Sequence, residues 1–382
     1  MSPGSPLFFA RESRTSYYGI TKMRCVINQF RPLYLNSKTN DIRLGNHPGT
    51  GTKIENAPFQ VLGILSHFLI PADRKAVAST LSSTFGMPID NVESLIQQLL
   101  DVGYLIDADA ASRVLDNSRL MREALYFAMQ GNYLRVPNRL SAIMHSHVTI
   151  LGIGGIGSII AETLARAGVG RPTIIDDDQV EESNLIRQTL FSYADIGRPK
   201  VEAATDALKR INPSITISAL MTTVKTDGFL AETVHDSDIV VSTIDRPVRS
   251  AREMVNRLCV STGTSFIFAG FSEHVGIAGP LVVPGETACY QCILEQNGEV
   301  DDITMNADRK IPSYGPLCLS IGAITSDEVI RYVSGYAPCS LMGTSLMLDM
   351  ATYTTTRQRW QRVDTCPVCS SREEKDATRN RR

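Results

Sequence analysis

The sequence has no long hydrophobic run and almost no net charge, and each absence narrows the class of protein that it encodes. A membrane span needs about eighteen apolar residues, and the longest candidate, residues 59–70, is interrupted by Gln60, Ser66 and His67. The 38 lysines and arginines balance 40 aspartates and glutamates, which argues against a strongly basic nucleic-acid-binding protein. The N-terminus lacks the apolar core of a secretory signal. We therefore expect a cytoplasmic protein without a membrane partner.

The composition itself is that of a globular protein. Hydrophobic residues make up 43% of the 382 residues and charged residues 20%. At about 150 residues per domain, this length predicts two to three domains. The eight cysteines need an explanation other than stable disulfides, because these are rare in the cytoplasm.

The N-terminal part predicts a small α+β domain of the winged-helix type over residues 29–110, after an N-terminal tail, residues 1–28. Apolar and polar residues alternate between residues 31 and 55, which is typical of short strands. Helical spacing follows in residues 59–65, in residues 73–84 and after Pro88. Residues 104–106 predict a closing strand.

The charges of this domain argue against DNA binding. No lysine or arginine lies between Ala76 and Ser112, so a helix there would gain no counterion release from phosphates. The segment resembles the peptide-recognition winged helix of enzymes that modify ribosomal peptides. That resemblance implies that a leader peptide adds a strand to a sheet edge. A dimerisation or capping domain is the alternative, and no nucleic-acid partner is expected.

Residues 111–371 predict a second, larger α/β domain, followed by a charged tail, residues 372–382. Residues 148–151 read as a strand, residues 158–167 as a helix, and residues 173–176 as the next strand. Because strands and helices alternate, we expect a Rossmann-like, mostly parallel sheet.

A glycine-rich turn lies between the first strand and helix of this domain. Its glycines are Gly152, Gly154, Gly155 and Gly157, and Asp176 ends the next strand. Glycines let the backbone approach a phosphate, the helix N-terminus favours negative charge, and a carboxylate at that strand end can bind ribose hydroxyls. The pattern predicts a nucleotide site. NAD is the usual ligand of such a turn, and a structural turn without a ligand is the alternative.

Two cations after the turn favour a nucleoside triphosphate over NAD. Arg187 and Lys200 are needed where pyrophosphate leaves, whereas the pyrophosphate of NAD is held mainly by backbone groups. Asp245 ends another strand and is the candidate ligand of Mg²⁺. An NAD-dependent oxidoreductase and a non-catalytic peptide-binding scaffold remain the alternatives from other classes.

These motifs resemble the adenylating superfamily of ubiquitin-activating enzymes and of ThiF and MoeB. The resemblance runs from about residue 119 to residue 369. It includes the double-glycine turn, Ser-Asn-Leu-x-Arg-Gln at residues 183–188 and Gly-x-x-Lys at residues 197–200. Within this superfamily, the sequence pattern is most similar to the microcin C7-type and pantocin-type peptide-maturing enzymes. These enzymes also carry an N-terminal peptide-binding domain.

The resemblance implies both a reaction and a set of site residues. The family makes an acyl adenylate from a carboxylate and ATP and releases pyrophosphate. By the resemblance, Asp176 holds the ribose, and Asp178 belongs to the same acidic strand end. Asn184, Arg187 and Lys200 hold the phosphates, and Asp245 holds Mg²⁺. The family forms homodimers in which an arginine reaches the neighbouring ATP site, and Arg122, with Arg119 as second choice, matches it.

Two Cys-x-x-Cys pairs predict a structural zinc site. Cys289 with Cys292 and Cys366 with Cys369 supply four thiolates, which close a tetrahedral zinc site without an open position. We expect this site to attach the C-terminal segment to the domain.

A thioester step is not expected. Residues 297–313, which match the loop that crosses the active site in thioester-forming members, contain no cysteine. Cys318 follows Gly315-Pro316 at the start of a helix, where the thiol pKa can be lowered, so it remains open. The sequence therefore predicts ATP- and Mg²⁺-dependent adenylation of a carboxylate or terminal amide on a ribosomal precursor peptide, in antibiotic biosynthesis. The alternative within the class is a sulfur-carrier adenylyltransferase of the ThiF or MoeB kind.

Overall fold

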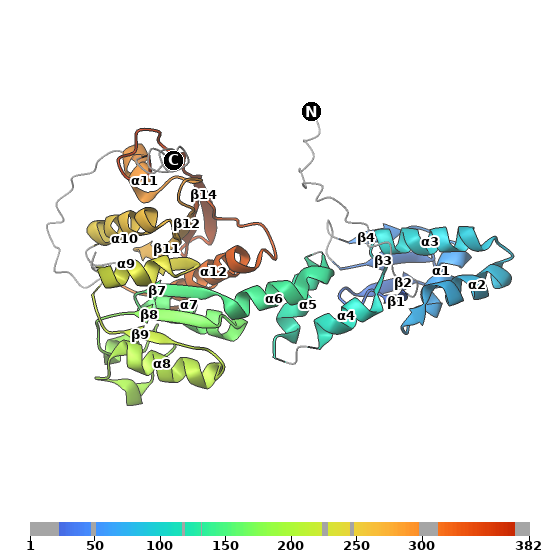
Figure 1. The fold of residues 1–382 in the computed structure, drawn as a ribbon, viewed down its shortest axis with the longest axis horizontal. Helices are drawn as coiled ribbons and strands as arrows, with labels where there is room; N and C mark the ends of the chain where they lie inside the picture. The colour runs from blue at the N-terminus through green and yellow to red at the C-terminus, as the bar shows by residue number, and fades with distance from the viewer. Residues whose placement is uncertain are drawn as a thin grey trace, which may run out of the picture. The chain divides into compact units, whose positions relative to one another are not determined.

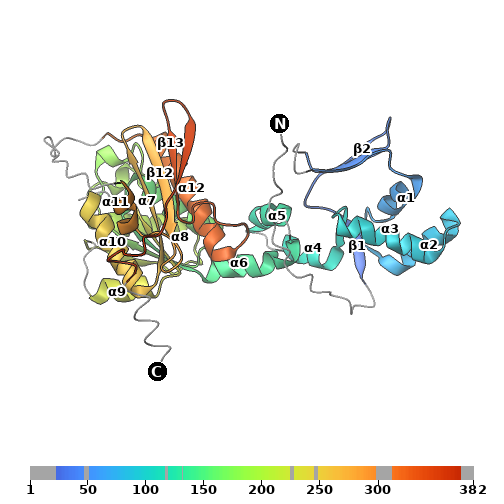
Figure 2. The ribbon, with the colours of Figure 1, turned by 90° about the horizontal axis from the view of Figure 1, so that it is seen from above.

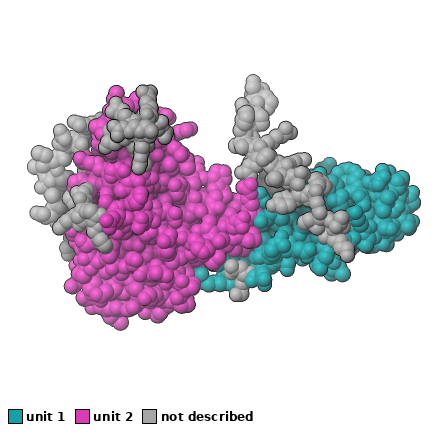
Figure 3. Space-filling model, viewed as in Figure 1, with its two compact units in different colours: residues 1–121, 131–134 teal, residues 122–130, 135–382 magenta. Residues whose placement is uncertain are grey.

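The structure is a computed structural model that describes residues 23–46, 51–116, 119–130, 132–223, 228–244, 248–297 and 312–370. The chain divides into two compact units (Figure 3). Residues 1–121 and 131–134 belong to the first unit, and residues 122–130 and 135–382 to the second. Each unit contains a cluster of buried hydrophobic residues.

The first unit combines two small sheets with short helices (Figure 1). Its elements are β1 (Arg24–Ile27), β2 (Leu33–Asn36), β3 (Asp41–Leu44), β4 (Thr52–Ile54), α1 (Phe59–His67), β5 (Ala72–Asp73), α2 (Arg74–Phe85), α3 (Ile89–Asp101), β6 (Leu105–Asp107) and α4 (Ala108–Leu115). One sheet has the order β5-β1-β6 and the other β2-β3-β4, and all pairs are antiparallel.

Local sequence signals explain where the helices of this unit begin and end. The Asp73 carboxylate accepts a hydrogen bond from the Ala76 backbone N–H at 2.9 Å and caps α2, which ends at Gly86 with a φ of 62°. The Tyr104 hydroxyl, which comes just before β6, donates to the carbonyls of Thr52 at 2.9 Å and Ile42 at 3.2 Å. These bonds hold β3 and β4 against the hydrophobic core of the first unit, to which Tyr104 belongs.

Two elements differ from the sequence-based boundaries. β1 lies in the segment expected to be a tail, and α4 spans the boundary expected at residue 110. β1 buries just Cys25 and Val26, which is too short a pattern to show a strand period. The buried positions of α4 are three alanines and Val114, which give a weak hydrophobic signal.

The second unit is built on an eight-stranded sheet in the described chain. The chain passes between the units in α5 (Met121–Met129) and η1 (Tyr133–Arg135). The elements that follow are α6 (Val136–His145), β7 (His147–Leu151), α7 (Gly155–Ala167), β8 (Arg171–Ile175), η2 (Glu182–Asn184), η3 (Tyr193–Asp195), α8 (Lys200–Ile211), β9 (Ser218–Leu220), α9 (Gly228–His235), β10 (Ile239–Ser242), α10 (Val248–Thr262), β11 (Ser265–Ser272), β12 (Val275–Val282), α11 (Tyr290–Asn297), α12 (Gly315–Ser334), β13 (Thr344–Asp349) and β14 (Thr354–Arg359).

The sheet order is β14-β13-β12-β11-β10-β7-β8-β9. The strands from β11 to β9 are parallel, and β12, β13 and β14 extend the sheet in antiparallel fashion. The expected Rossmann-like, mostly parallel architecture is confirmed, whereas the antiparallel extension was not predicted. The chain runs outward from β7 to β9 and returns to β10 on the other side of β7. Such folds bind ligands where the strand order reverses, which here is the sheet edge formed by the carboxyl ends of β7 and β10, called the crevice edge below.

Helices cover both faces of this sheet. α7 packs against α8 and α12, and α10 packs against α9 and α11. Figure 2 shows α9, α10 and α11 on one side of the sheet and α12 on the other. No helix of the described residues combines the length and apolar character that crossing a membrane requires.

Candidate functional site

The glycine turn joins β7 to α7 at the crevice, and its glycines have different steric roles. A Cβ atom on Gly157 would lie 1.9 Å from the carbonyl oxygen of Gly152, so α7 can start this close to β7 only with glycine there. A Cβ on Gly155 would lie 2.8 Å from the sulfur of Cys318 and 3.3 Å from the Arg187 stem. A Cβ on Gly154 would meet nothing within 4 Å. The turn is therefore closely packed at Gly155 and Gly157, and it has open space at Gly154, the residue just before α7.

Thr243 holds this turn from the neighbouring strand. Its hydroxyl donates to the carbonyls of Gly152 at 2.9 Å and Leu151 at 3.1 Å, and its backbone N–H donates to Leu151 at 2.9 Å. The same oxygen lies 2.9 Å from the Cβ positions of both Gly152 and Gly157. Sequence reasoning missed Thr243, because a threonine after a buried strand carries no motif.

Asp176 and Lys200 meet at the carboxyl end of β8. The Asp176 carboxylate accepts hydrogen bonds from the backbone N–H groups of Ile153 at 2.6 Å and Asp178 at 2.9 Å. The Lys200 ammonium donates to the Asp178 carboxylate at 2.6 Å and lies 3.9 Å from that of Asp176. The structure thus brings together three of the predicted residues and joins Asp176 directly to the glycine turn.

The surroundings of these charges differ. Burial raises the pKa of the Asp176 carboxyl above its ordinary value, and Lys200 and the two N–H donors oppose that rise. The Lys200 side chain is 6% exposed, whereas that of Asp178 is 68% exposed. A buried ammonium therefore lies beside the glycine turn and is held by an acid that solvent can reach.

Arg187 and Asn184 lie in the short η2 turn and its continuation. The Asn184 side-chain oxygen accepts a hydrogen bond from the Glu181 backbone N–H at 3.1 Å, which closes the turn, and Asn184 is buried. The Arg187 guanidinium donates to the Ser183 carbonyl at 2.8 Å while its stem lies against Gly155. Arg187 is thus beside the turn as predicted, and Asn184 has a structural contact in the described chain.

The described structure does not place the remaining predicted residues beside the glycine turn. Asp245 lies outside the described residues. Arg122 is exposed on α5 in the second unit, and Arg119 is exposed and belongs to the first.

The four predicted cysteines form one buried cluster. Their sulfur atoms lie within 4.8 Å of one another. Cys289 is 3.9 Å from Cys292 and 3.6 Å from Cys366, and Cys292 is 3.5 Å from Cys369. Zinc–sulfur bonds of about 2.3 Å in a tetrahedron imply sulfur separations of about 3.8 Å. The donor set and its spacing therefore fit zinc.

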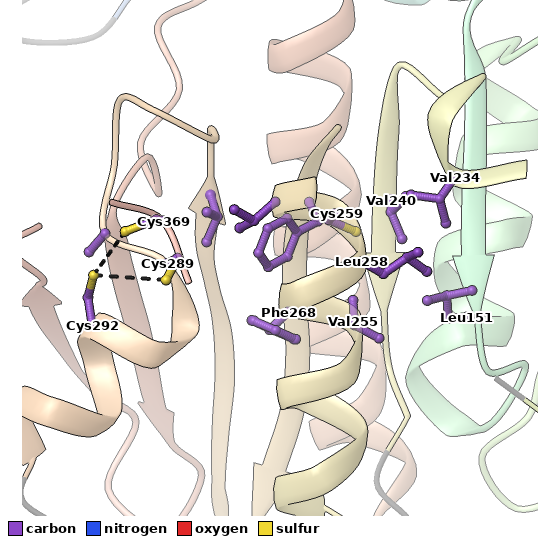
Figure 4. Packing of buried hydrophobic residues seen from close by; sticks show 14 of the residues in the cluster. Leu151, Val234, Val240, Val255, Leu258, Cys259, Phe268, Cys289, Cys292 and Cys369 are labelled. Carbon is purple, nitrogen blue, oxygen red and sulfur yellow. Dashed lines mark hydrogen bonds between the residues drawn. The ribbon is translucent and has the colours of Figure 1, made fainter. Parts of the chain in front are cut away.

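Neighbouring groups donate hydrogen bonds to two of the four sulfur atoms. The Asn256 side-chain amide donates to the sulfur of Cys289 at 3.7 Å, and the Val363 backbone N–H donates to that of Cys292 at 3.5 Å. The hydrogen bond between the two sulfur atoms raises the pKa of Cys289 and lowers that of Cys292. Figure 4 shows the cluster beside the core of the second unit.

Cys318 lies in the first turn of α12 and is fully buried. Burial raises the pKa of its thiol, although the hydrogen bond with Ser313 and the charge of Arg187 lower it in part. The expected lowering by the helix N-terminus is thus outweighed. A buried thiol with a raised pKa is a poor nucleophile, so the structure gives no support to a thioester at Cys318.

The fold and these two sites together define a class of protein. A doubly wound domain holds a glycine turn, a buried lysine and an arginine at its crevice, and a four-cysteine cluster closes its C-terminal segment. This arrangement fits an enzyme that binds a nucleotide and carries a four-thiol group suited to a structural metal.

The chain belongs to the ThiF family, whose sequence model matches residues 131–370. It is 33% identical over 230 residues to the sulfur carrier protein ThiS adenylyltransferase of Escherichia coli K12, covering 59% of this chain and 87% of the relative. It is also 33% identical to the molybdopterin-synthase adenylyltransferase of that organism, covering 60% and 88%. The protein is therefore an ATP-dependent adenylyltransferase.

Solved structures share the fold over more of the chain. The crystal structure of E. coli MccB with ATP matches with a TM-score of 0.74 and 24% identity, covering 91% of this chain and 100% of that chain. PaaA matches with a TM-score of 0.69 and 23% identity, covering 87% and 99%. The family match confirms the predicted membership of the adenylating superfamily, and these solved structures show that the chain shares their fold.

Thr243→Val should weaken Mg²⁺-ATP binding about tenfold. The substitution keeps the shape of the side chain and removes the hydroxyl that fixes the turn, and one hydrogen bond contributes about 0.5–1.5 kcal/mol. Thr243→Ser should bind ATP as the wild type does. Calorimetric titration with ATP measures the effect. Thr149→Val is the control, because it removes a buried hydroxyl bonded to Ser237 in the same sheet. ATP affinity unchanged in Thr243→Val would contradict the assignment.

Proposed function

We propose that this protein adenylates a carboxylate, or a terminal amide, on a ribosomally synthesised precursor peptide, as a step in peptide antibiotic biosynthesis and without a thioester. The N-terminal unit binds the peptide. The enzyme acts as a homodimer in which Arg122 of one chain reaches the ATP site of the other. Mg²⁺ accompanies ATP, with Asp245 as its candidate ligand.

One observation carries the peptide proposal: the chain has a folded unit before its adenylating domain. The sulfur-carrier adenylyltransferases match about three-fifths of this chain, whereas MccB matches 91% of it. MccB is described as a microcin C7 biosynthetic enzyme and has been solved in complex with N-formylated MccA. Peptide binding is thus a property of a protein with this two-part fold.

The first unit offers a sheet edge for a peptide. In the described chain, β2 and β4 each pair with β3 alone. Tyr34 and Leu35 of β2 are exposed, at 40% and 57%. An extended leader can add to such an edge through main-chain hydrogen bonds, which is the binding mode we propose.

The residues of the crevice would divide the work of adenylation. The turn and the N-terminus of α7 bind phosphate oxygens, and Asp176 binds the ribose while it fixes the turn. Lys200 exchanges Asp178 for the phosphates, and Arg187 neutralises the leaving pyrophosphate. A carboxylate oxygen forms a bond to the α-phosphorus, and pyrophosphate leaves with the electron pair of the broken bond.

A sulfur-carrier adenylyltransferase is the second candidate. The 33% identity to the ThiS adenylyltransferase favours it, and the cations of the crevice would serve both reactions. The candidates differ in the acyl substrate, which is a peptide in one and the C-terminus of a folded carrier protein in the other.

Pyrophosphate exchange distinguishes these functions. The full chain is incubated with Mg²⁺-ATP and labelled pyrophosphate, and with either candidate precursor peptides or a ThiS-like carrier. We expect label in ATP with a peptide, and less of it when the leader part is removed. Exchange with the carrier alone would replace the peptide proposal by the second candidate. Nicotinamide reduction without exchange would exclude both.

A further inference from the structure

Arg252 is a cation at the crevice that belongs to none of the predicted motifs. It lies on α10 and is partly buried, with its guanidinium carbon 5.8 Å from the centre of the Phe268 ring. Its Nη2 atom lies 3.1 Å from the position that a Cβ on Gly270 would take. Phe268 pairs in register with Ser242, the last residue of β10. The guanidinium is therefore beside the carboxyl end of β11, at the crevice edge of the sheet.

The charge of Arg252 has no acidic partner in the part of the chain that the structure describes. Its neighbour Glu253 pairs with Arg257 at 3.2 Å. An arginine stays protonated at any physiological pH, and withdrawing its charge from water is costly unless an anion compensates it. The contact with the Phe268 ring offsets part of that cost. Such a site is suited to binding an anion.

The strand order places Arg252 and Lys200 on opposite sides of β7. Lys200 lies at the end of β8, on one side of β7, whereas Arg252 lies at the end of β11, beyond β10 on the other side. In phosphoryl transfer the attacking and leaving oxygens are roughly in line through phosphorus. If Lys200 and Arg187 hold the leaving pyrophosphate, the attacking group enters from the side of Arg252.

We propose that Arg252 binds the carboxylate of the acyl substrate and turns one of its oxygens toward the α-phosphorus of ATP. This inference rests on the proposed adenylation, with a carboxylate rather than a terminal amide as the group that is activated. The carboxylate enters as an anion, so its oxygen forms the new bond to phosphorus without any proton transfer. The bond from phosphorus to the bridging oxygen breaks, and pyrophosphate leaves with the electron pair. A side chain at Gly270 would require the guanidinium to shift by a few tenths of an ångström.

The test uses N-acetylglycinate, a minimal peptide C-terminus, as the probe. The full-length protein is loaded with Mg²⁺ and α,β-methylene-ATP, which cannot release pyrophosphate, and titrated with the probe while binding is followed by calorimetry. We expect millimolar binding to the wild type, at least tenfold weaker binding to Arg252→Gln, and intermediate binding to Arg252→Lys. The uncharged analogue N-acetylglycinamide should not bind. Arg257→Gln, an exposed arginine of the same helix, should bind the probe as the wild type does.

The outcomes separate this inference from the proposed function. Equal probe affinity in the wild type and Arg252→Gln would overturn it, as would a wild type that does not bind the probe. Weaker binding of α,β-methylene-ATP to Arg252→Gln, with unchanged probe affinity, would assign the residue to phosphate instead. A lower melting temperature with unchanged probe affinity would show a structural role. If probe binding depends on Arg252 and yet no acyl substrate supports pyrophosphate exchange, adenylation fails while the carboxylate site stands.

Discussion

Lys200→Ala is expected to lower the rate of pyrophosphate exchange by about a hundred- to a thousandfold, the usual effect of removing one stabiliser of developing charge. Lys200 is the buried cation of the crevice, with its ammonium 2.6 Å from Asp178 and 3.9 Å from Asp176. Without it, the two carboxylates would face the phosphates uncompensated. Arg187→Ala should act in the same direction, because the stem of that arginine lies against Gly155 of the same turn.

The control must separate lost chemistry from lost folding. Lys209 lies on the same helix and is exposed, so Lys209→Ala should leave exchange unchanged. Thermal denaturation of Lys200→Ala should remain one cooperative transition. Wild-type exchange rates in both Lys200→Ala and Arg187→Ala would contradict the triphosphate site at this turn.

Cys289→Ser should remove the bound zinc and lower the melting temperature of the protein by more than about 10 °C. The four sulfur atoms are buried together, and the binding free energy of a structural zinc is coupled to folding. Lowering the pH should release the metal, because its ligands must be thiolates. Elemental analysis measures the metal, with about one zinc per chain expected in the wild type, and calorimetry measures the melting.

Cys339→Ser is the matched control for the zinc site, because this thiol is partly buried and lies outside the cluster. It should retain the metal and melt near the wild type. A metal-free wild type that melts in the same range would show that the four thiols do not form a zinc site.

The parts of the site that depend on local chain geometry were predictable. Gly152 and Gly157 are required where a helix starts within van der Waals distance of a strand, and such a requirement appears directly in the residue type. The two cysteine pairs could be recognised for a similar reason, because a closed tetrahedral metal site of this type requires four thiols in any fold. The position of Asp176 was predictable because the carboxyl ends of parallel strands lie at one edge of the sheet.

Residues whose role comes from the pairing of distant strands could not be predicted. Thr243 acts on Gly152 because β10 happens to lie beside β7, and Arg252 reaches the crevice because α10 packs over Phe268. Neither residue belongs to a sequence motif that would predict this placement. The same holds for β12, β13 and β14, whose antiparallel pairing depends on turns and contacts beyond their own short patterns.

The cysteine cluster also constrains the polypeptide before it folds. Cys289 and Cys366 are 77 residues apart, and α12, β13 and β14 lie between them. A metal held by both pairs closes this stretch into a ring and removes configurations from the denatured ensemble, an effect that grows slowly with the length of the ring. α12 carries Cys318, which packs under the glycine turn. A metal bound there would therefore also limit the motion of the helix that supports the glycine turn.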